Sequence, residues 1–411
     1  MNRFRLFLVL LCLSFGVGLH AGEGFGVGVW VHAGMFSGEK SRAIKELNEK
    51  LGFYKGIGID DLYVFQALKK EHRKGWDFLK QLIKVARRNG LKVHPVVTAG
   101  HRIRVEGKIK KHPEWLIRDQ FGKTRPYLNL SHPGAREHIV KKVRKLLRYE
   151  VDGIHLDYIR FPYLKPKISA DSPISVLIRL LRFTWGWYIP DHLHNHVMDH
   201  YFSYDDQTLR EFENHYRQQF SGESLTREHV TQAWVRWNAG NVTLLVREID
   251  EKIQKSGKKI PLSAAILSNR EFAFFSLGQD WKHWAELGIV DALCPMVYSN
   301  NHPWFRERVK GVVQTVKGKS EVYAGIGIRS SANENTPEGV KEQIQIARDE
   351  GADGVVFFSG YSLDKEFGAA IRNELKSQIP NSKSQTNSND SNSKVQNKNE
   401  EDESKIPNPK S

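Results

Sequence analysis

The amino-acid sequence predicts a parallel (β/α)8 barrel, on two observations. Eight short apolar, β-branched runs alternate with segments whose apolar residues recur at helical spacing. The runs are apolar nearly throughout, which is typical of strands buried on both faces of a parallel sheet. The predicted strands are residues 26–32, 61–65, 92–97, 153–157, 262–266, 292–298, 322–326 and 354–358. An open, doubly wound sheet is the alternative, and it is disfavoured because no glycine-rich phosphate-binding turn follows the first strand.

Both ends of the chain differ in composition from the barrel. Residues 1–21 combine Arg3 and Arg5 with an apolar run and small residues, a pattern typical of a signal peptide, so we expect export to the periplasm or beyond. That run is too short to span a membrane, and the mature chain is expected to carry no integral membrane segment. Residues 377–411 are almost entirely polar and predict a disordered tail. Residues 22–376 then form a single barrel domain.

The 411-residue chain is basic, with a formal net charge of +15. The polar tail holds five lysines and five acidic residues and the signal holds two arginines, so a net charge of +13 belongs to the barrel domain. A basic exported protein can meet nucleic acid, anionic lipid or an anionic envelope polymer. The basic residues lie mostly on predicted amphipathic helices and no nucleic-acid-binding motif occurs, so we expect solvated helix faces and no nucleic-acid partner. Of the two cysteines, Cys12 falls in the signal, which excludes a disulfide framework or a cysteine zinc site.

A large insertion, residues 163–247, follows the fourth predicted strand. It contains four tryptophans and further helical patterns. In a barrel, the segment after a strand's carboxyl end lies on the catalytic face, so the insertion is expected to wall or cover the site. Packing of its distal half on the flank of the barrel is the alternative.

The densest group of reactive residues lies in residues 151–162, at the end of the fourth strand. The two-residue period of a strand points His155 and Asp157 to the same side, with Asp157 at the strand's exit. A carboxylate there can act as a nucleophile or base. Arg160 can keep it ionised or bind an anionic sugar substituent, and Tyr158 offers a phenol or a stacking face. The alternative is a salt bridge that only fixes the strand–loop junction.

The block Asp-Gly-Ile-His-Leu-Asp-Tyr-Ile-Arg-Phe-Pro, residues 152–162, resembles the signature of the family 10 glycosylhydrolase-like proteins, bacterial envelope proteins with a TIM barrel. Further blocks resemble that family in the same order along the chain. They are residues 28–33, 112–116, 128–133, 202–205, 279–284 and 294–298. The resemblance spans roughly residues 24–375.

The resemblance implies hydrolysis of a glycosidic bond in a bacterial envelope glycan such as peptidoglycan, without a cofactor. It aligns Asp157 with the nucleophile of α-amylase-type barrels, although His155 replaces an arginine of that pattern. A glycosidase also needs a second carboxyl group. The candidates are Glu271, which follows the fifth strand, and Asp280, whose pKa the neighbouring Trp281 could raise. Asp280 directly precedes a helical pattern and can equally be that helix's N-cap.

Aromatic and polar residues at expected strand ends are the candidates for substrate binding, because aromatic faces suit the apolar faces of sugar rings. They are Trp30, His32, His94, His155, Tyr158, Arg160, Trp281 and Tyr298.

Two other functions remain open. His32, His94 and His155 together with Asp157 could bind a catalytic metal in a polysaccharide deacetylase, and residues 191–200 are also rich in histidine and aspartate. No His-x-His marks the first strand, so we expect no metal. A noncatalytic glycan-binding barrel is the second alternative, because no clear glutamate ends the fifth strand.

Overall fold

The computed structural model describes residues 24–68, 75–119, 122–163, 202–219 and 227–377. The predicted signal and the predicted tail therefore lie outside the described residues, together with the cluster at residues 191–200.

Eight parallel strands close into a barrel in the order β1-β10-β9-β8-β7-β6-β3-β2. They are β1 Gly26–His32, β2 Asp61–Phe65, β3 Lys92–Thr98, β6 Ile154–Asp157, β7 Leu262–Ile266, β8 Ala292–Pro295, β9 Glu321–Gly327 and β10 Gly354–Phe358. The (β/α)8 barrel predicted from the sequence is confirmed. The predicted strand 292–298 is too long, because regular pairing with the neighbouring strands ends at Pro295 and only a bridge from Met296 to Gly325 continues it.

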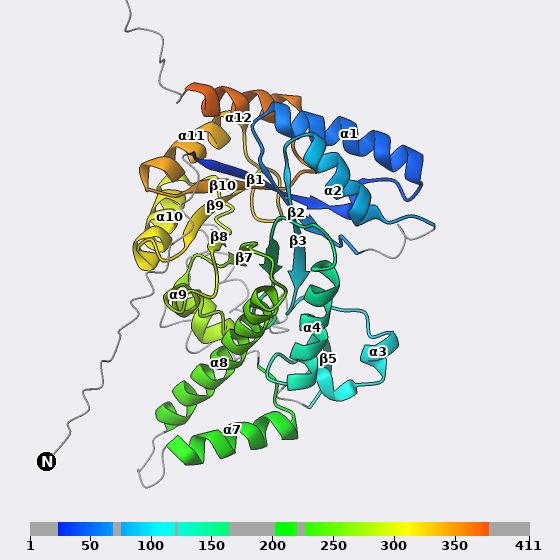
Figure 1. The fold of residues 1–411 in the computed structure, drawn as a ribbon. Helices are drawn as coiled ribbons and strands as arrows, with labels where there is room; N and C mark the ends of the chain where they lie inside the picture. Colours follow the sequence, from blue (N-terminus) through cyan, green and yellow to red (C-terminus); the bar gives the residue numbers. More distant parts are fainter. Residues whose placement is uncertain (1–23, 69–74, 120–121, 164–201, 220–226, 378–411) are drawn as a thin grey trace, which may run out of the picture.

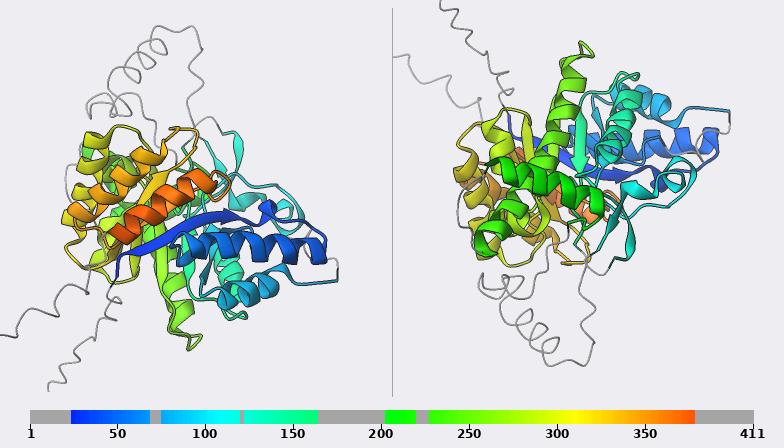
Figure 2. Two further views of the ribbon diagram at one scale, coloured as in Figure 1. Left: turned by 90° about the horizontal axis from the view of Figure 1, so that it is seen from above. Right: turned by 90° about the horizontal axis from the view of Figure 1, so that it is seen from below.

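Helices surround the strands (Figures 1 and 2). The helices that alternate with strands are α1 Lys40–Gly56, α2 Phe78–Arg88, α4 Pro133–Leu146, α8 Arg227–Gln254, α9 Trp281–Glu286, α10 His302–Val316, α11 Pro337–Asp349 and α12 Lys365–Ser377. Several of them begin at residues that suit a helix N-terminus. Asp77, Asn301 and Thr336 each accept a hydrogen bond from a backbone N–H of the first turn.

The long connection from β3 to α4 holds its own small elements. They are α3 Gly107–Lys110, the 3-10 turn Pro113–Trp115 and the antiparallel strands β4 Leu116–Arg118 and β5 Thr124–Leu128. Shorter turns follow β1 (3-10, Ala33–Met35) and β7 (π-helical, Phe272–Ser276).

The strands separate two apolar cores. Side chains on their outer face pack against the helices, whereas inward-facing side chains fill the barrel. The interior cluster consists of Trp30, Tyr63, Val96, Ala265, Cys294 and Val356. Neighbouring residues of a strand point to opposite faces, and an apolar core lies against each face. Nearly every strand residue is therefore buried, which explains the continuously apolar runs in the sequence.

Aspartates fix the amino-terminal ends of the strands. The carboxylates of Asp152, Asp291 and Asp353 accept hydrogen bonds from the backbone N–H groups of Val93, Leu262 and Val322, at 2.9, 2.7 and 2.8 Å. These acids stabilise the face of the barrel opposite to the one where barrel enzymes carry their chemistry.

The described part of the insertion forms two helices, α7 Asp206–Gln219 and α8. Figure 1 shows α7 and the first half of α8 extending away from the strands. Trp234 and Trp237 stack at 5.5 Å and pack with Phe212, while Asn238 accepts a hydrogen bond from Ser131 before α4. These contacts join the described part of the insertion to the start of α4.

No helix in the described ranges is both long enough and apolar enough to cross a membrane.

Candidate active site

A cleft of about 640 Å³ opens at the carboxyl ends of the strands. Its walls include the last residues of five strands, together with residues from the loops and from α4. The lining residues are Trp30, Val31, His32, Phe65, Gln66, Ala67, Leu68, Val96, Val97, Thr98, His101, Lys142, Lys145, Leu146, Asp157, Tyr158, Phe358, Ser359 and Tyr361. The cleft therefore lies where the barrel rule places chemistry.

Asp157 is the one carboxylate among these described lining residues. It ends β6 and is 6% exposed. Its Oδ1 accepts a hydrogen bond from the backbone N–H of Tyr158 at 2.6 Å, and no described residue donates to its Oδ2. Burial raises the pKa of Asp157, and the positive charge of Arg160 only partly opposes this. One oxygen is thus anchored, and the other is available to a ligand.

Tyr158 and Arg160 form one side of the site. Tyr158 has a left-handed backbone (φ 50°), which costs a non-glycine residue about 1 kcal/mol and is found preferentially at functional positions. Its ring contacts His101 edge-on at 4.6 Å and carries the Arg160 guanidinium at 4.7 Å. Arg160 makes no direct ion pair with Asp157, and its buried Nη1 has no hydrogen-bond partner among the described residues. Its donor therefore remains free for a ligand oxygen.

His155 lies below Asp157 and does not face the cleft. Its Nε2 accepts a hydrogen bond from Trp30 Nε1 at 3.1 Å, and its Nδ1 lies 2.8 Å from Ser263 Oγ. Since the indole can only donate, Nε2 is unprotonated and the proton sits on Nδ1. Burial lowers the pKa of His155 to about 3. His155 therefore acts on the cleft only indirectly, by orienting Trp30 through this hydrogen bond. Trp30 itself lines the cleft, as its predicted role in substrate binding requires.

Because His155 is buried in its neutral form, we expect the folded protein to lose stability in acid. The folded His155 has a pKa of about 3, whereas an unfolded histidine has a pKa of about 6.5, so between these values the unfolded chain binds more protons. Burial of neutral His155 makes its full contribution to the free energy of unfolding above pH about 6.5. As the pH falls from there to about 3, this contribution is lost at up to about 1.4 kcal/mol per pH unit. Urea unfolding of wild type and His155→Gln at several pH values measures this. Equal pH slopes for the two proteins would contradict the assignment.

Aromatic rings surround the mouth of the barrel. Tyr298 and Phe358 stack at 5.1 Å, and both meet Trp30 edge-on, at 6.3 and 6.1 Å. On the other side His32 stacks with Phe65 at 6.2 Å and lies 6.4 Å from Tyr361, which is 60% exposed. Such surfaces suit the apolar faces of sugar rings. The structure thus brings the predicted residues Trp30, His32 and Tyr298 close to Asp157.

His94 lies elsewhere, and its predicted role in substrate binding is wrong. It points into the barrel near the amino-terminal ends of the strands, where its Nε2 lies 2.8 Å from Asp61 Oδ1. Both side chains are buried, and Gly153 leaves room for the ring. The three strand histidines thus sit at three levels of the barrel, each with its own partner. They do not gather around Asp157, and the described residues include no group of three or more potential metal ligands.

Asp280, Glu271 and Trp281 do not reach the cleft either. The Gln279 side chain accepts a hydrogen bond from the Leu267 N–H at 2.8 Å and donates to the Ala265 carbonyl at 3.3 Å, so the loop closes over β7 and turns outward. Asp280 therefore becomes the N-cap of α9, as in its alternative reading. Trp281 is 1% exposed in the outer core, and Glu271 is exposed at the start of the π-helical turn.

Several cleft residues were not predicted. Phe65 and Phe358 end their strands two residues after Tyr63 and Val356, so strand periodicity could have found them. Tyr361, His101, Lys142 and Lys145 lie on loops and on a helix, and no local pattern separates them from ordinary surface residues.

Comparison with protein families gives a match over more than half of the chain. The model described as Glycosyl hydrolase-like 10 matches residues 60–170 and 192–344. No curated protein matches the sequence significantly.

Solved structures of glycosidases share the fold. The glycoside hydrolase domain of PgaB (BpsB) from Bordetella bronchiseptica has a TM-score of 0.59 at 12% identity, over 86% of this chain and 99% of that one. The catalytic domain of a beta-amylase from Paenibacillus polymyxa has a TM-score of 0.55 at 11% identity, over 87% and 99% of the chains. A beta-galactosidase from Bacillus circulans sp. alkalophilus has a TM-score of 0.55 at 14% identity, over 86% and 55%.

Proposed function

The chain belongs to the glycosyl hydrolase-like 10 family, and from that premise we propose that it hydrolyses a glycosidic bond in a bacterial envelope glycan such as peptidoglycan, with Asp157 as the essential carboxylate. The observation that carries the proposal is the position of Asp157. It is a strand-end carboxylate with one anchored and one available oxygen, in a cleft walled by aromatic rings. Glycosidases act through carboxyl groups placed in this way.

Burial supports a proton-transfer role for Asp157. Its pKa is raised, so the carboxyl group can exchange a proton closer to neutral pH than an exposed aspartate does. The Nη1 of Arg160 is available to hold a sugar hydroxyl or an anionic substituent beside it. Burial and the charge of Asp157 also raise the pKa of Tyr298, which keeps this phenol protonated as a hydrogen-bond donor.

A noncatalytic glycan-binding barrel is the second candidate function. The observation that favours it is that the described cleft residues supply a single carboxylate, whereas most glycosidases use two. Neither Asp280 nor Glu271 supplies the second. No comparable observation favours a metal-dependent deacetylase.

Export is part of the proposal and rests on the sequence of residues 1–21. A mature amino terminus near Gly22, found by sequencing protein isolated from cells, would support it, and an intact Met1 would argue against it.

The proposed hydrolysis is tested by incubating purified protein with peptidoglycan and with other bacterial glycans and analysing the products by mass spectrometry. We expect shortened glycan fragments with new reducing ends. Binding without any cleavage would favour the glycan-binding barrel, and release of acetate that chelators abolish would favour a deacetylase.

A further inference from the structure

Two lysines of α4, Lys142 and Lys145, line the same cleft as Asp157. Lys142 is half-buried, and Lys145 is exposed. They lie where the cleft reaches past the end of β3, beside Leu68, Val97 and Leu146. A ligand that fills the cleft from Asp157 to this end meets two positive charges.

Neither lysine forms an ion pair with any carboxylate of the described residues. The other cations of the same helix segment behave differently. Lys141 and Arg144 both pair with Glu137, at 3.1 and 3.8 Å, and neither of them is among the described residues that line the cleft. The unpaired charges of α4 are therefore the ones that face the cleft.

The charges around Lys142 repel one another. Its pKa is lowered by burial and then by Lys145. One turn earlier, the pKa of His138 is lowered to about 4 by burial and then by Lys142, Lys108, Lys145 and Lys141. The positive charges of Lys108, Lys142 and Lys145 thus lie near one another around His138. A bound anion would relieve this repulsion.

The loop that leads to this end of the cleft is also basic. Residues 101–111 contain five arginines and lysines and a single acidic residue, Glu106. All five cations are exposed, and Lys108 lies over the Trp115 ring at 5.4 Å. His101, which begins the loop, lines the cleft and contacts Tyr158. Positive charge therefore continues from the cleft to the surface.

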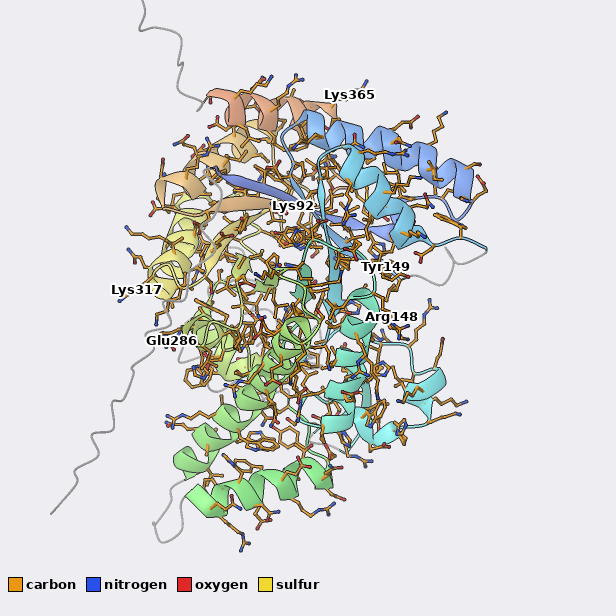
Figure 3. All side chains as sticks on the ribbon, viewed as in Figure 1. Lys92, Arg148, Tyr149, Glu286, Lys317 and Lys365 are labelled. Carbon is orange, nitrogen blue, oxygen red and sulfur yellow. The ribbon has the colours of Figure 1, made fainter. Side chains whose placement is uncertain are left out.

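We propose that Lys142 and Lys145 form an anion-binding subsite at one end of the Asp157 cleft, so that the glycan bound there carries a carboxylate or phosphate group. The inference deepens the proposed function by naming the chemical class of its glycan. The net charge of the chain is not the argument, because cationic side chains also lie at other places on the surface, such as the labelled Arg148, Lys317 and Lys365 (Figure 3). It depends on the two lysines that line the cleft.

Binding to matched glycans tests the subsite. The probes are peptide-free peptidoglycan strands with free carboxylates, the same strands after conversion of the carboxylates to amides, and poly(glycerol phosphate). All proteins carry Asp157→Asn so that the probes are not consumed. The test variant adds Lys142→Gln and Lys145→Gln. The control adds Lys84→Gln and Arg88→Gln, which remove two exposed charges of α2 that do not line the cleft.

We expect an anionic probe to bind at least about tenfold more tightly than the amidated strands, which corresponds to about 1.4 kcal/mol. This preference should largely disappear in the Lys142/Lys145 variant and persist in the control, with unchanged circular dichroism in both. Preference for the carboxylated strands or for the phosphate polymer identifies the anion. Equal binding of all probes, or a preference that survives loss of the two lysines, would overturn the inference. A charge preference without hydrolysis by wild type would leave the subsite standing and refute only the hydrolase proposal.

Discussion

Replacement of Asp157 by asparagine is expected to lower turnover of a susceptible glycan by at least about 10³-fold, a loss of about 4 kcal/mol of transition-state stabilisation. Asparagine keeps the size of the side chain, and its Oδ1 can still accept the hydrogen bond from the Tyr158 N–H. The substitution removes the negative charge and the ability to exchange a proton. Folding and glycan binding should persist, so the loss should appear in kcat.

Asp152→Asn is the matched control. Asp152 lies two residues before the start of β6, at the amino-terminal end of the barrel, where its carboxylate accepts a hydrogen bond from the Val93 N–H. This variant removes the same charge from the same segment, but far from the cleft. We expect nearly normal turnover, measured by release of reducing ends. Comparable activity of Asp157→Asn and Asp152→Asn would refute the catalytic assignment of Asp157.

The strands and the position of Asp157 could be predicted because both depend on local sequence. Strand residues 61–65, 262–266 and 354–358 are largely apolar and lie between clear breaks, and their bounds agree with the structure. Asp157 follows from the two-residue period and from the general rule for barrel strands. Its neighbours Trp30, His32 and Tyr298 follow from the same rule.

The errors arose where tertiary contacts decide the position of a side chain. His94 lies on the inward face of β3, as expected, but it is four residues before the strand's end, and its height in the barrel places it beside Asp61. The sequence offers Asp280 as a candidate because the neighbouring Trp281 could raise its pKa, whereas the Gln279 hydrogen bonds turn the loop outward. Lys142 and Lys145 face the cleft because of how α4 packs, and the sequence of an amphipathic helix does not reveal such neighbours.

Gly100→Ala is expected to lower the free energy of unfolding by at least about 3 kcal/mol. A Cβ at Gly100 would lie 1.8 Å from the carbonyl oxygen of Arg160 and 3.0 Å from that of Tyr158. Both are backbone atoms, so no side-chain rotation can relieve the overlap. The loop after β3 must then move away from residues 158–160, which breaks the hydrogen bond from the Gly100 N–H to the Tyr158 carbonyl, now 2.6 Å long.

The same movement should impair catalysis in the molecules that remain folded. The Ala99 N–H donates to the Asp157 carbonyl at 3.2 Å, so a displaced loop also displaces the Asp157 carboxylate. A shift of about 1 Å in a reacting group can cost about 10²-fold in rate. Gly311→Ala on α10 is the control, because its Cβ meets nothing within 4 Å and should raise stability by up to about 1 kcal/mol. Urea unfolding and turnover below the transition measure both effects. Wild-type stability and activity of Gly100→Ala would show that this loop does not hold Asp157 in place.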